Sequence, residues 1–158
     1  MKWFVAVSGN IGSGKSTVTT VLSEKLGWSQ DRTTYEDAEI FARNLYLQGL
    51  MDERDFRNYY ELFNTMLQFL RPPDLILYLQ APVQMLLERI HRRARDFEQR
   101  IPPAYLQQLN ERYAEWVERF RLCPILTVDA ERLDLAHLDS LVAEMQARLP
   151  SLFPLIER

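Results

Sequence analysis

The chain has 158 residues, of which 47% are apolar and 26% are charged, a composition typical of one globular domain with a sizeable core. Its net charge of -3 argues against a protein that coats nucleic acid, and no apolar run is long enough to span a membrane. Cys123 is the only cysteine, so an intramolecular disulfide is impossible and a zinc site is disfavoured. Because the N-terminus enters a strand-like run without a signal peptide, we expect a cytoplasmic location.

A glycine-rich loop at residues 9–16 reads Gly-Asn-Ile-Gly-Ser-Gly-Lys-Ser and fits the phosphate-binding pattern G-x-x-x-x-G-K-[ST]. The apolar run before it, Lys2 to Ser8, predicts a buried parallel strand. Apolar residues at helical spacing after it predict a helix from Ser16 to Leu26, which Gly27 ends. This strand and helix context favours a nucleoside triphosphate site over a simple glycine turn.

The chemistry of this loop assigns a role to each part. Glycines let successive backbone N–H groups point at a phosphate, and the helix start adds the positive end of its dipole. Lys15 would reach the outer phosphates of ATP, and the Ser16 hydroxyl would bind Mg²⁺. The residues that we expect to contact ATP are Gly9, Asn10, Ile11, Gly12, Ser13, Gly14, Lys15, Ser16 and Thr17.

Strand-like and helix-like patterns alternate along the rest of the chain. Helices are predicted at about 35–47, with Gly49 as its stop, and at 51–70, 83–93, 103–121 and 138–149; strands are predicted at 74–79 and 125–128. Such alternation predicts an α/β fold, in which helices flank a parallel sheet and ligands bind at the carboxyl ends of the strands.

The helix predicted at 51–70 carries a broad apolar and aromatic stripe. Its members are Phe56, Tyr59, Tyr60, Phe63, Met66, Leu67 and Leu70. A stripe of this kind is more often part of a core or a dimer interface than a cofactor site. We therefore expect the aromatic-rich helices to pair two copies of the chain as a homodimer, and packing inside the domain is the alternative for the stripe.

Five arginines fall within the twelve residues from Arg89 to Arg100, between two predicted helices. The transition state of phosphoryl transfer spreads negative charge over the equatorial oxygens, and an arginine placed there can raise the rate by about a thousandfold or more. The alternative is a solvated helix end whose cations interact with the helix dipole. Together with the phosphate loop, the segment favours a lid that closes over the phosphates.

Residues 31–37 read Asp-Arg-Thr-Thr-Tyr-Glu-Asp, and residues 101–106 read Ile-Pro-Pro-Ala-Tyr-Leu. With the phosphate loop and Arg93-Ala94-Arg95, these motifs resemble the deoxynucleoside kinase family, in particular its bacterial deoxyadenosine and deoxyguanosine kinases. The resemblance covers nearly the whole chain, and the order of the motifs is specific. It implies a single P-loop kinase domain over residues 1–158, an NTPase-type parallel sheet flanked by helices, with an arginine-rich lid.

The resemblance also implies roles for the residues of these motifs. Asp31 would help to hold Mg²⁺, and Arg32 would sit beside the acceptor 5′-hydroxyl and the phosphates, which suits a carboxylate and a guanidinium. A local helix cap with an ion pair is the alternative for this pair. Arg93 and Arg95 match the lid arginines that close on the phosphates.

Three acidic residues match substrate-binding positions of the family. Asp37 would contact the nucleobase, and Glu98 would accept a hydrogen bond from the sugar 3′-hydroxyl. Asp129 falls in the loop that lies along the adenine of ATP, although polar residues after a strand are often only a turn.

One part of the family pattern is missing. The resemblance implies several dozen residues between the first helix and the Asp-Arg-Thr motif, including a strand whose glutamate is the general base, and they are absent here. A helix of eleven residues carries the chain about 16 Å from the phosphate loop. Returning along a neighbouring strand needs roughly five extended residues, and only residues 27–30 are available. We hypothesise that residues are missing between Leu26 and Asp31, whether deleted or omitted from the sequence.

These observations predict an ATP-dependent kinase that phosphorylates the 5′-hydroxyl of a deoxynucleoside in nucleotide salvage. Deoxyadenosine and deoxyguanosine are the expected acceptors, Mg²⁺ the cofactor, and neither nucleic acid nor a membrane is an expected partner. A nucleoside monophosphate kinase is an alternative because it shares the loop and the lid. A nucleotide-binding protein without catalysis is another, if the missing segment is truly deleted.

Overall fold

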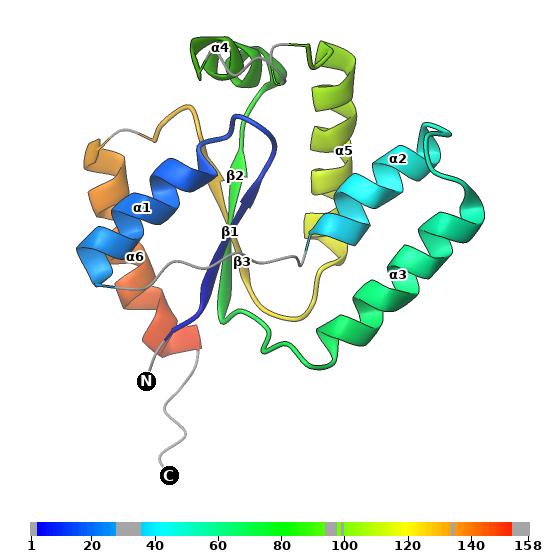
Figure 1. Cartoon of the computed structure of the whole chain (residues 1–158). Coiled ribbons are helices and arrows are strands. Elements are labelled where there is room, and N and C mark those ends of the chain that lie inside the picture. Colours follow the sequence, from blue (N-terminus) through cyan, green and yellow to red (C-terminus); the bar gives the residue numbers. More distant parts are fainter. Residues whose placement is uncertain (1–2, 28–35, 94–97, 99, 134, 153–158) are drawn as a thin grey trace.

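The computed structural model describes residues 3–27, 36–93, 98, 100–133 and 135–152 (Figure 1). Three of the predicted site residues, Asp31, Arg32 and Arg95, lie outside this part of the chain, as does most of the interval in which we expect missing residues. Within the described residues, no helix is long and apolar enough to cross a membrane.

Three parallel strands form the central sheet. They are β1 (Val5–Gly9), β2 (Leu75–Gln80) and β3 (Ile125–Asp129), arranged in the order β1-β2-β3. Val5 lies opposite Leu75 in the first pair, and Ile76 lies opposite Ile125 in the second. The central strand is an unbroken apolar run that is buried on both faces, as a parallel strand requires. The predicted α/β fold with a parallel sheet is confirmed.

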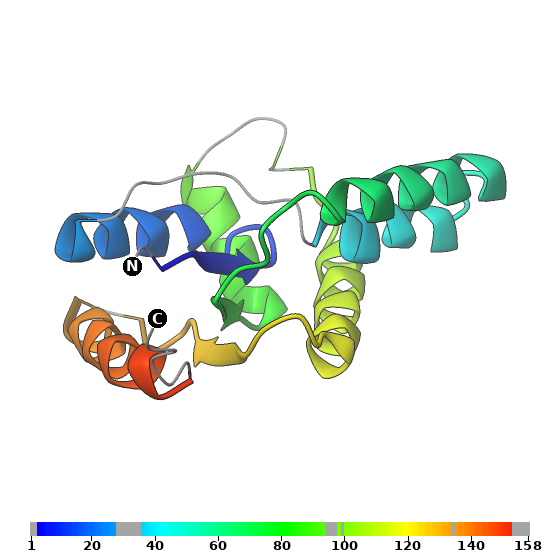
Figure 2. The same cartoon turned by 90° about the horizontal axis from the view of Figure 1, so that it is seen from below.

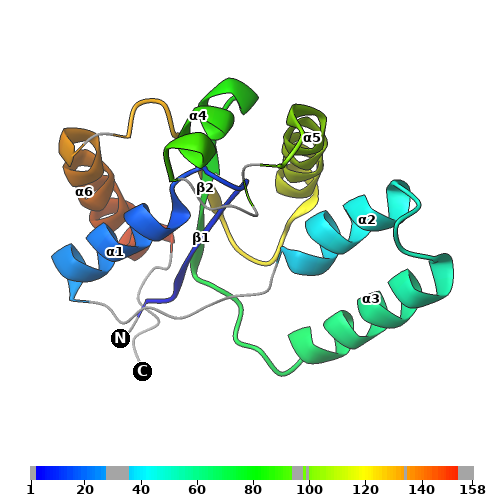
Figure 3. The same cartoon turned by 45° about the horizontal axis from the view of Figure 1, so that its top comes forward.

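Helices cover both faces of this sheet. Their bounds are α1 (Lys15–Leu26), η1 (Asp37–Ala42), α2 (Arg43–Leu47), α3 (Glu53–Leu67), α4 (Val83–Arg93), α5 (Pro103–Arg119) and α6 (Leu135–Leu152). Seen from below, α1 and α6 lie on one side of the sheet, whereas α2, α3 and α5 lie on the other (Figure 2). Helix α4 lies beyond the carboxyl ends of the strands, above the loop that follows β1 (Figure 3).

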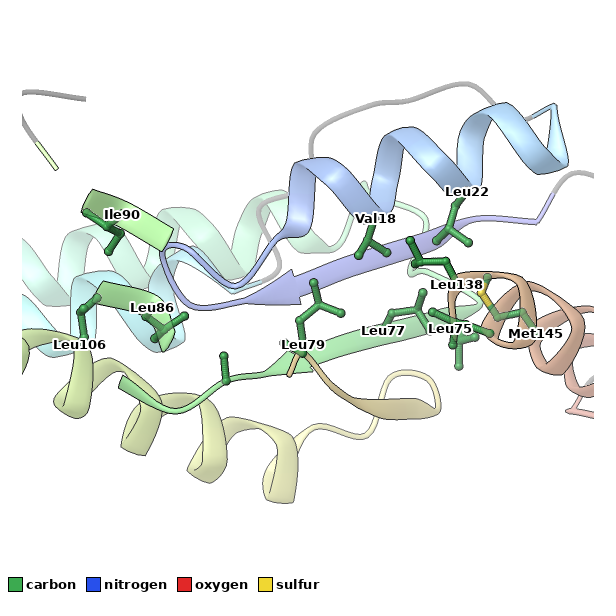
Figure 4. Close-up of a cluster of buried hydrophobic side chains, with 13 residues drawn as sticks. Val18, Leu22, Leu75, Leu77, Leu79, Leu86, Ile90, Leu106, Leu138 and Met145 are labelled. Atoms are coloured by element: carbon green, nitrogen blue, oxygen red, sulfur yellow. The ribbon is translucent and has the colours of Figure 1, made fainter. Parts of the chain in front are cut away.

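Side chains of β2 supply both halves of the core, because successive residues of a strand point to opposite faces. On one face Leu75, Leu77 and Leu79 pack with side chains of α1 and α6 (Figure 4). On the other face Ile76 and Tyr78 belong to a second cluster, with Leu109, Tyr113 and Trp116 of α5 and Ile40 of η1. Complete burial of one such leucine stabilises the fold by about 1.5–3 kcal/mol.

The single helix predicted at about 35–47 is wrong in detail. The chain forms a π-helical segment, η1, which continues as the short α-helix α2. Buried positions alternate as Ala38, Ile40, Ala42 and Asn44, instead of following one helical stripe. The reason is tertiary, because η1 packs against α3 and α5 at once and therefore buries more than one face.

The aromatic stripe of α3 is only partly buried. Phe63 is in the core, and Tyr46 of α2 stacks on Phe56 at a ring separation of 4.8 Å. Met66 and Leu70 of the stripe are 46% and 42% exposed. Two apolar residues beside the stripe, Leu62 and Phe69, are 60% and 83% exposed. Packing inside the domain therefore does not account for the whole stripe, and the outer part forms an apolar surface.

Candidate active site

The phosphate loop joins β1 to α1 at the carboxyl end of the sheet. Gly12 and Gly14 have φ angles of 85° and 103°, which residues with a Cβ rarely adopt. At Gly12 a Cβ would also lie 3.0 Å from the carbonyl oxygen of Leu86. Glycine at these positions lets the loop curl at the start of α1, where the helix dipole favours a phosphate.

Lys15, the first residue of α1, points back across the loop. Its Nζ donates hydrogen bonds to the carbonyls of Gly9 and Asn10, the latter at 3.1 Å. Burial lowers the pKa of Lys15, the nearby Arg93 guanidinium acts in the same direction, and the Glu36 carboxyl opposes both. In this structure the loop's own carbonyls hold the ammonium group that is expected to bind phosphate.

Glu36 lies near Lys15, and we did not assign it a role from the sequence. Burial raises the pKa of Glu36, whereas interactions with Ser8, Lys15 and Tyr113 lower it. Its Oε2 atom is buried and has no hydrogen-bond partner among the described residues. The only signal for this residue is its place in the 31–37 motif, since sequence spacing does not bring it to Lys15.

Asn10 and Ser13 are the deeply buried polar residues of the loop. The Nδ2 atom of Asn10 donates to the Leu106 carbonyl at 2.9 Å and to Oδ1 of Asn110 at 2.8 Å. Its Oδ1 accepts a hydrogen bond from the backbone N–H of Ile11 at 2.7 Å. Asn10 therefore holds the loop against α5 instead of facing a ligand, and its predicted contact with ATP stays a prediction.

A cavity of about 440 Å³ lies between the phosphate loop and α4. Ser13, Gly14 and Thr17 line one side of it, and Arg89, Arg92 and Arg93 line the other. Leu133 and Leu138 add an apolar wall. Its size is that of a small-molecule site, and its cations and apolar wall suit a ligand with phosphates and a flat ring.

Arg89 connects two sides of this cavity through hydrogen bonds that were not predicted from the sequence. Its Nη1 donates to the Ser13 carbonyl at 2.7 Å, and its Nη2 donates to the Ala130 carbonyl at 2.9 Å. Burial lowers the pKa of Arg89, and the guanidinium groups of Arg93 and Arg92 act in the same direction. The sequence shows it only as one of five neighbouring arginines, with nothing to separate it from the others.

The other predicted residues lie in different parts of the fold. Ser16 and Thr17 are exposed at the start of α1, and Arg93 is exposed at the end of α4 beside the cavity. Asp37 is half-buried at the start of η1, where burial raises its pKa, and Glu98 is buried.

Asp129, at the end of β3, accepts a hydrogen bond from the Glu131 N–H at 2.9 Å and pairs with Arg132 at 3.3 Å. It lines a different cavity, of about 230 Å³.

The described residues contain no cluster of three or more His, Cys, Asp or Glu side chains that could hold a metal ion. Mg²⁺ does not need such a cluster, because it commonly binds one or two protein oxygens together with substrate phosphates and water. The exposed Ser16 hydroxyl, beside the loop, fits that requirement.

Comparison with known proteins identifies the family. The model of the deoxynucleoside kinase family matches residues 28–149. The deoxyadenosine/deoxycytidine kinase of Bacillus subtilis is 27% identical over 184 residues, covering 84% of this chain and 85% of that enzyme. The deoxyadenosine kinase of Dictyostelium discoideum is 38% identical over 110 residues, covering 69% of this chain and 44% of that enzyme.

A solved structure shares the fold. Deoxyadenosine kinase from M. mycoides with bound dATP superposes with a TM-score of 0.77 at 23% identity, covering 90% of this chain and 98% of that one.

The alignment with the Bacillus enzyme is longer than this chain, 184 positions against 158 residues. The Bacillus enzyme therefore carries internal residues that have no counterpart here. The family model nevertheless matches most of the chain, and the fold agrees with it. The chain belongs to the deoxynucleoside kinase family of phosphotransferases.

Proposed function

We propose that this chain transfers the γ-phosphoryl group of ATP to the 5′-hydroxyl of a purine deoxynucleoside in nucleotide salvage. The observation that carries the proposal is the cavity in which the phosphate loop faces Arg92 and Arg93 of α4. Phosphoryl transfer requires groups that neutralise the negative charge of the transition state. A phosphate loop on one side of the cavity and arginines on the other meet this requirement. Curated relatives are named for deoxyadenosine, deoxyguanosine and deoxycytidine, so the preference for purines rests on the family resemblance of the 31–37 motif.

The residues of the chain take the following parts. Lys15 moves from the loop carbonyls to the outer phosphates, and Arg93 and Arg95 close over the transferring group. Arg32 orients the acceptor oxygen beside them. Ser16 and Asp31, together with the phosphates, would hold Mg²⁺, which would neutralise part of the negative charge of the donor. Positioning and electrostatics provide most of the rate enhancement.

Substrate binding falls to the acidic residues. Asp37 contacts the nucleobase, Glu98 the 3′-hydroxyl of the sugar, and Asp129 the adenine of ATP. The first two are partly or fully buried, which suits groups that bind a substrate away from water. Asp129 lines a second cavity, which shares Leu133 with the cavity of the phosphate loop.

A test of the reaction class is an acceptor series with MgATP as donor. Deoxyadenosine, deoxyguanosine, deoxycytidine and thymidine are compared with dAMP and dTMP. Transfer to the purine deoxynucleosides supports the proposal. Transfer to the monophosphates and not to the nucleosides would identify a nucleoside monophosphate kinase and refute it.

A nucleotide-binding protein without catalysis is a second candidate. The internal residues present in the Bacillus enzyme and absent here are the observation behind it. An intact mass of 18.7 kDa for the natural protein would show that the segment is absent. A mass several kilodaltons higher would show that the complete kinase carries it, together with the further strand and the base that the family resemblance implies.

We also propose that the protein forms a homodimer through the outer face of α3. Leu62 and Met66 are exposed on α3, and Phe69 and Leu70 are exposed just after it. Several large apolar side chains exposed along one segment often mark a surface that a partner covers. A cytoplasmic location, where ATP and salvaged nucleosides are available, stays our prediction.

A further inference from the structure

Helix α5 holds the phosphate loop through two polar side chains that none of the sequence motifs assigns. Asn110 and Tyr113 are three residues apart on α5 and therefore lie on one face of the helix. Oδ1 of Asn110 accepts from Nδ2 of Asn10 at 2.8 Å, and its Nδ2 donates to the Ala81 carbonyl at 3.0 Å. The Tyr113 hydroxyl donates to the Gly9 carbonyl at 2.8 Å.

The Gly9 carbonyl thus accepts hydrogen bonds from two side chains, the Lys15 ammonium and the Tyr113 hydroxyl. Gly9 is buried, and a buried carbonyl that loses all of its partners is destabilised. When Lys15 turns toward the phosphates of ATP, it leaves this carbonyl. Tyr113 is then the side chain that still satisfies Gly9.

We propose that Tyr113 and Asn110 are positioning residues, which keep the phosphate loop in its nucleotide-binding shape while Lys15 exchanges the loop carbonyls for the phosphates of ATP. Asn110 links the loop to the end of β2 through Ala81 and to α5 through Asn10. Tyr113 continues to donate a hydrogen bond to the Gly9 carbonyl after Lys15 has left it. The inference rests on the proposed function, because it takes ATP as the ligand that draws Lys15 away.

The surroundings of Tyr113 suit this role. Its side chain is fully buried; its ring stacks on Tyr78 at 5.6 Å and meets Trp116 and Phe41 edge-on at 6.4 Å each. Burial raises the pKa of Tyr113 well above its ordinary value, and the Glu36 carboxyl acts in the same direction. The hydroxyl therefore stays protonated and can donate a hydrogen bond at any physiological pH. In a Tyr113→Phe variant the phenylalanine ring would fill the same space without the hydroxyl.

Titration calorimetry with ATP and with AMP on the full chain tests the inference, using Tyr113→Phe and Asn110→Ala. AMP enters the same site but lacks the outer phosphates that attract Lys15. We expect each variant to bind ATP about tenfold more weakly, the effect of one unsatisfied buried group, and to bind AMP as the wild type does. Tyr46→Phe, whose ring stacks on Phe56 away from the loop, and the exposed Gln107→Ala on α5 are the matched controls.

Several results would overturn the inference. Unchanged ATP affinity in both variants would show that α5 does not position the loop. An equal loss for ATP and AMP would show a general structural role instead. If Tyr113→Phe does not fold, Asn110→Ala decides alone. A wild-type chain that binds no ATP would refute the proposed function itself, an outcome distinct from any difference between variants.

Discussion

The guanidinium of Arg89 donates a hydrogen bond to the Ser13 carbonyl over 2.7 Å, so that helix α4 is tied directly to the phosphate loop. Its second hydrogen bond, to the Ala130 carbonyl at 2.9 Å, reaches the segment after β3. One side chain therefore joins three segments that lie far apart in the sequence: helix α4, the phosphate loop and the segment after β3. Each of these segments contributes residues to the lining of the cavity.

Arg89→Lys should weaken the site because one ammonium group cannot reproduce the forked geometry that serves two carbonyls. We expect KM for ATP to rise by about tenfold, which is the effect of losing roughly one hydrogen bond of this kind. Steady-state kinetics with varied ATP measure it. Gln84→Ala is the control on the same helix, since Gln84 is exposed and bonds only to Glu88 among the contacts described. An unchanged KM for Arg89→Lys would show that the two carbonyl contacts do not matter for binding.

Lys15→Ala and Arg32→Ala should each abolish phosphoryl transfer while the fold stays intact. In the proposed reaction each substitution would remove a cation from the transferring phosphate, and a loss of about a thousandfold or more in kcat is expected. Radiometric transfer assays measure activity, and circular dichroism checks the fold. Normal turnover in either variant would remove the basis of the assignment.

The burial of Glu36 predicts a pH dependence of stability. Its pKa in the folded chain lies above the ordinary 4.5, so the folded chain binds more protons than the unfolded chain between these two values. The contribution of this carboxyl is therefore fully present below the ordinary pKa and is lost as pH rises through the folded pKa.

Urea unfolding of wild type and Glu36→Gln at several pH values between 4.5 and 8 tests this. The free energy of unfolding of the wild type, relative to the variant, should fall as pH rises. A difference that grows with pH would contradict the assigned direction.

If the apolar face of α3 forms the proposed dimer interface, charged residues introduced on it should weaken the homodimer. Leu62 and Met66 are four residues apart, on one side of the helix, and are 60% and 46% exposed. Leu62→Glu with Met66→Glu should weaken the dimer by about a hundredfold or more, because two charges would be buried without partners. Light scattering after size exclusion measures the mass of the particle. The control is Glu61→Gln, which alters an exposed residue on the same helix. A wild type that is monomeric at all concentrations would refute the dimer.

Much of the fold follows from local pattern. The bounds of β2 and of the helix at 83–93 were predicted nearly to the residue. Both elements show local patterns, a continuous apolar run and a helical repeat of apolar residues, which can be recognised from residues that are neighbours in the sequence. The phosphate loop was predicted for the same reason, since glycines, lysine and serine at fixed spacing carry the chemistry themselves.

By itself, then, the sequence determined the α/β class, the phosphate loop with Lys15, and the family. Only the tertiary structure decided that Arg89 holds the loop, that Glu36 lies near Lys15, and that Asn110 reaches Asn10 across 100 residues of chain. It also decided which part of the α3 stripe is buried. These contacts join segments that are distant in the sequence, and a single chain shows no periodicity or spacing from which such pairs can be read.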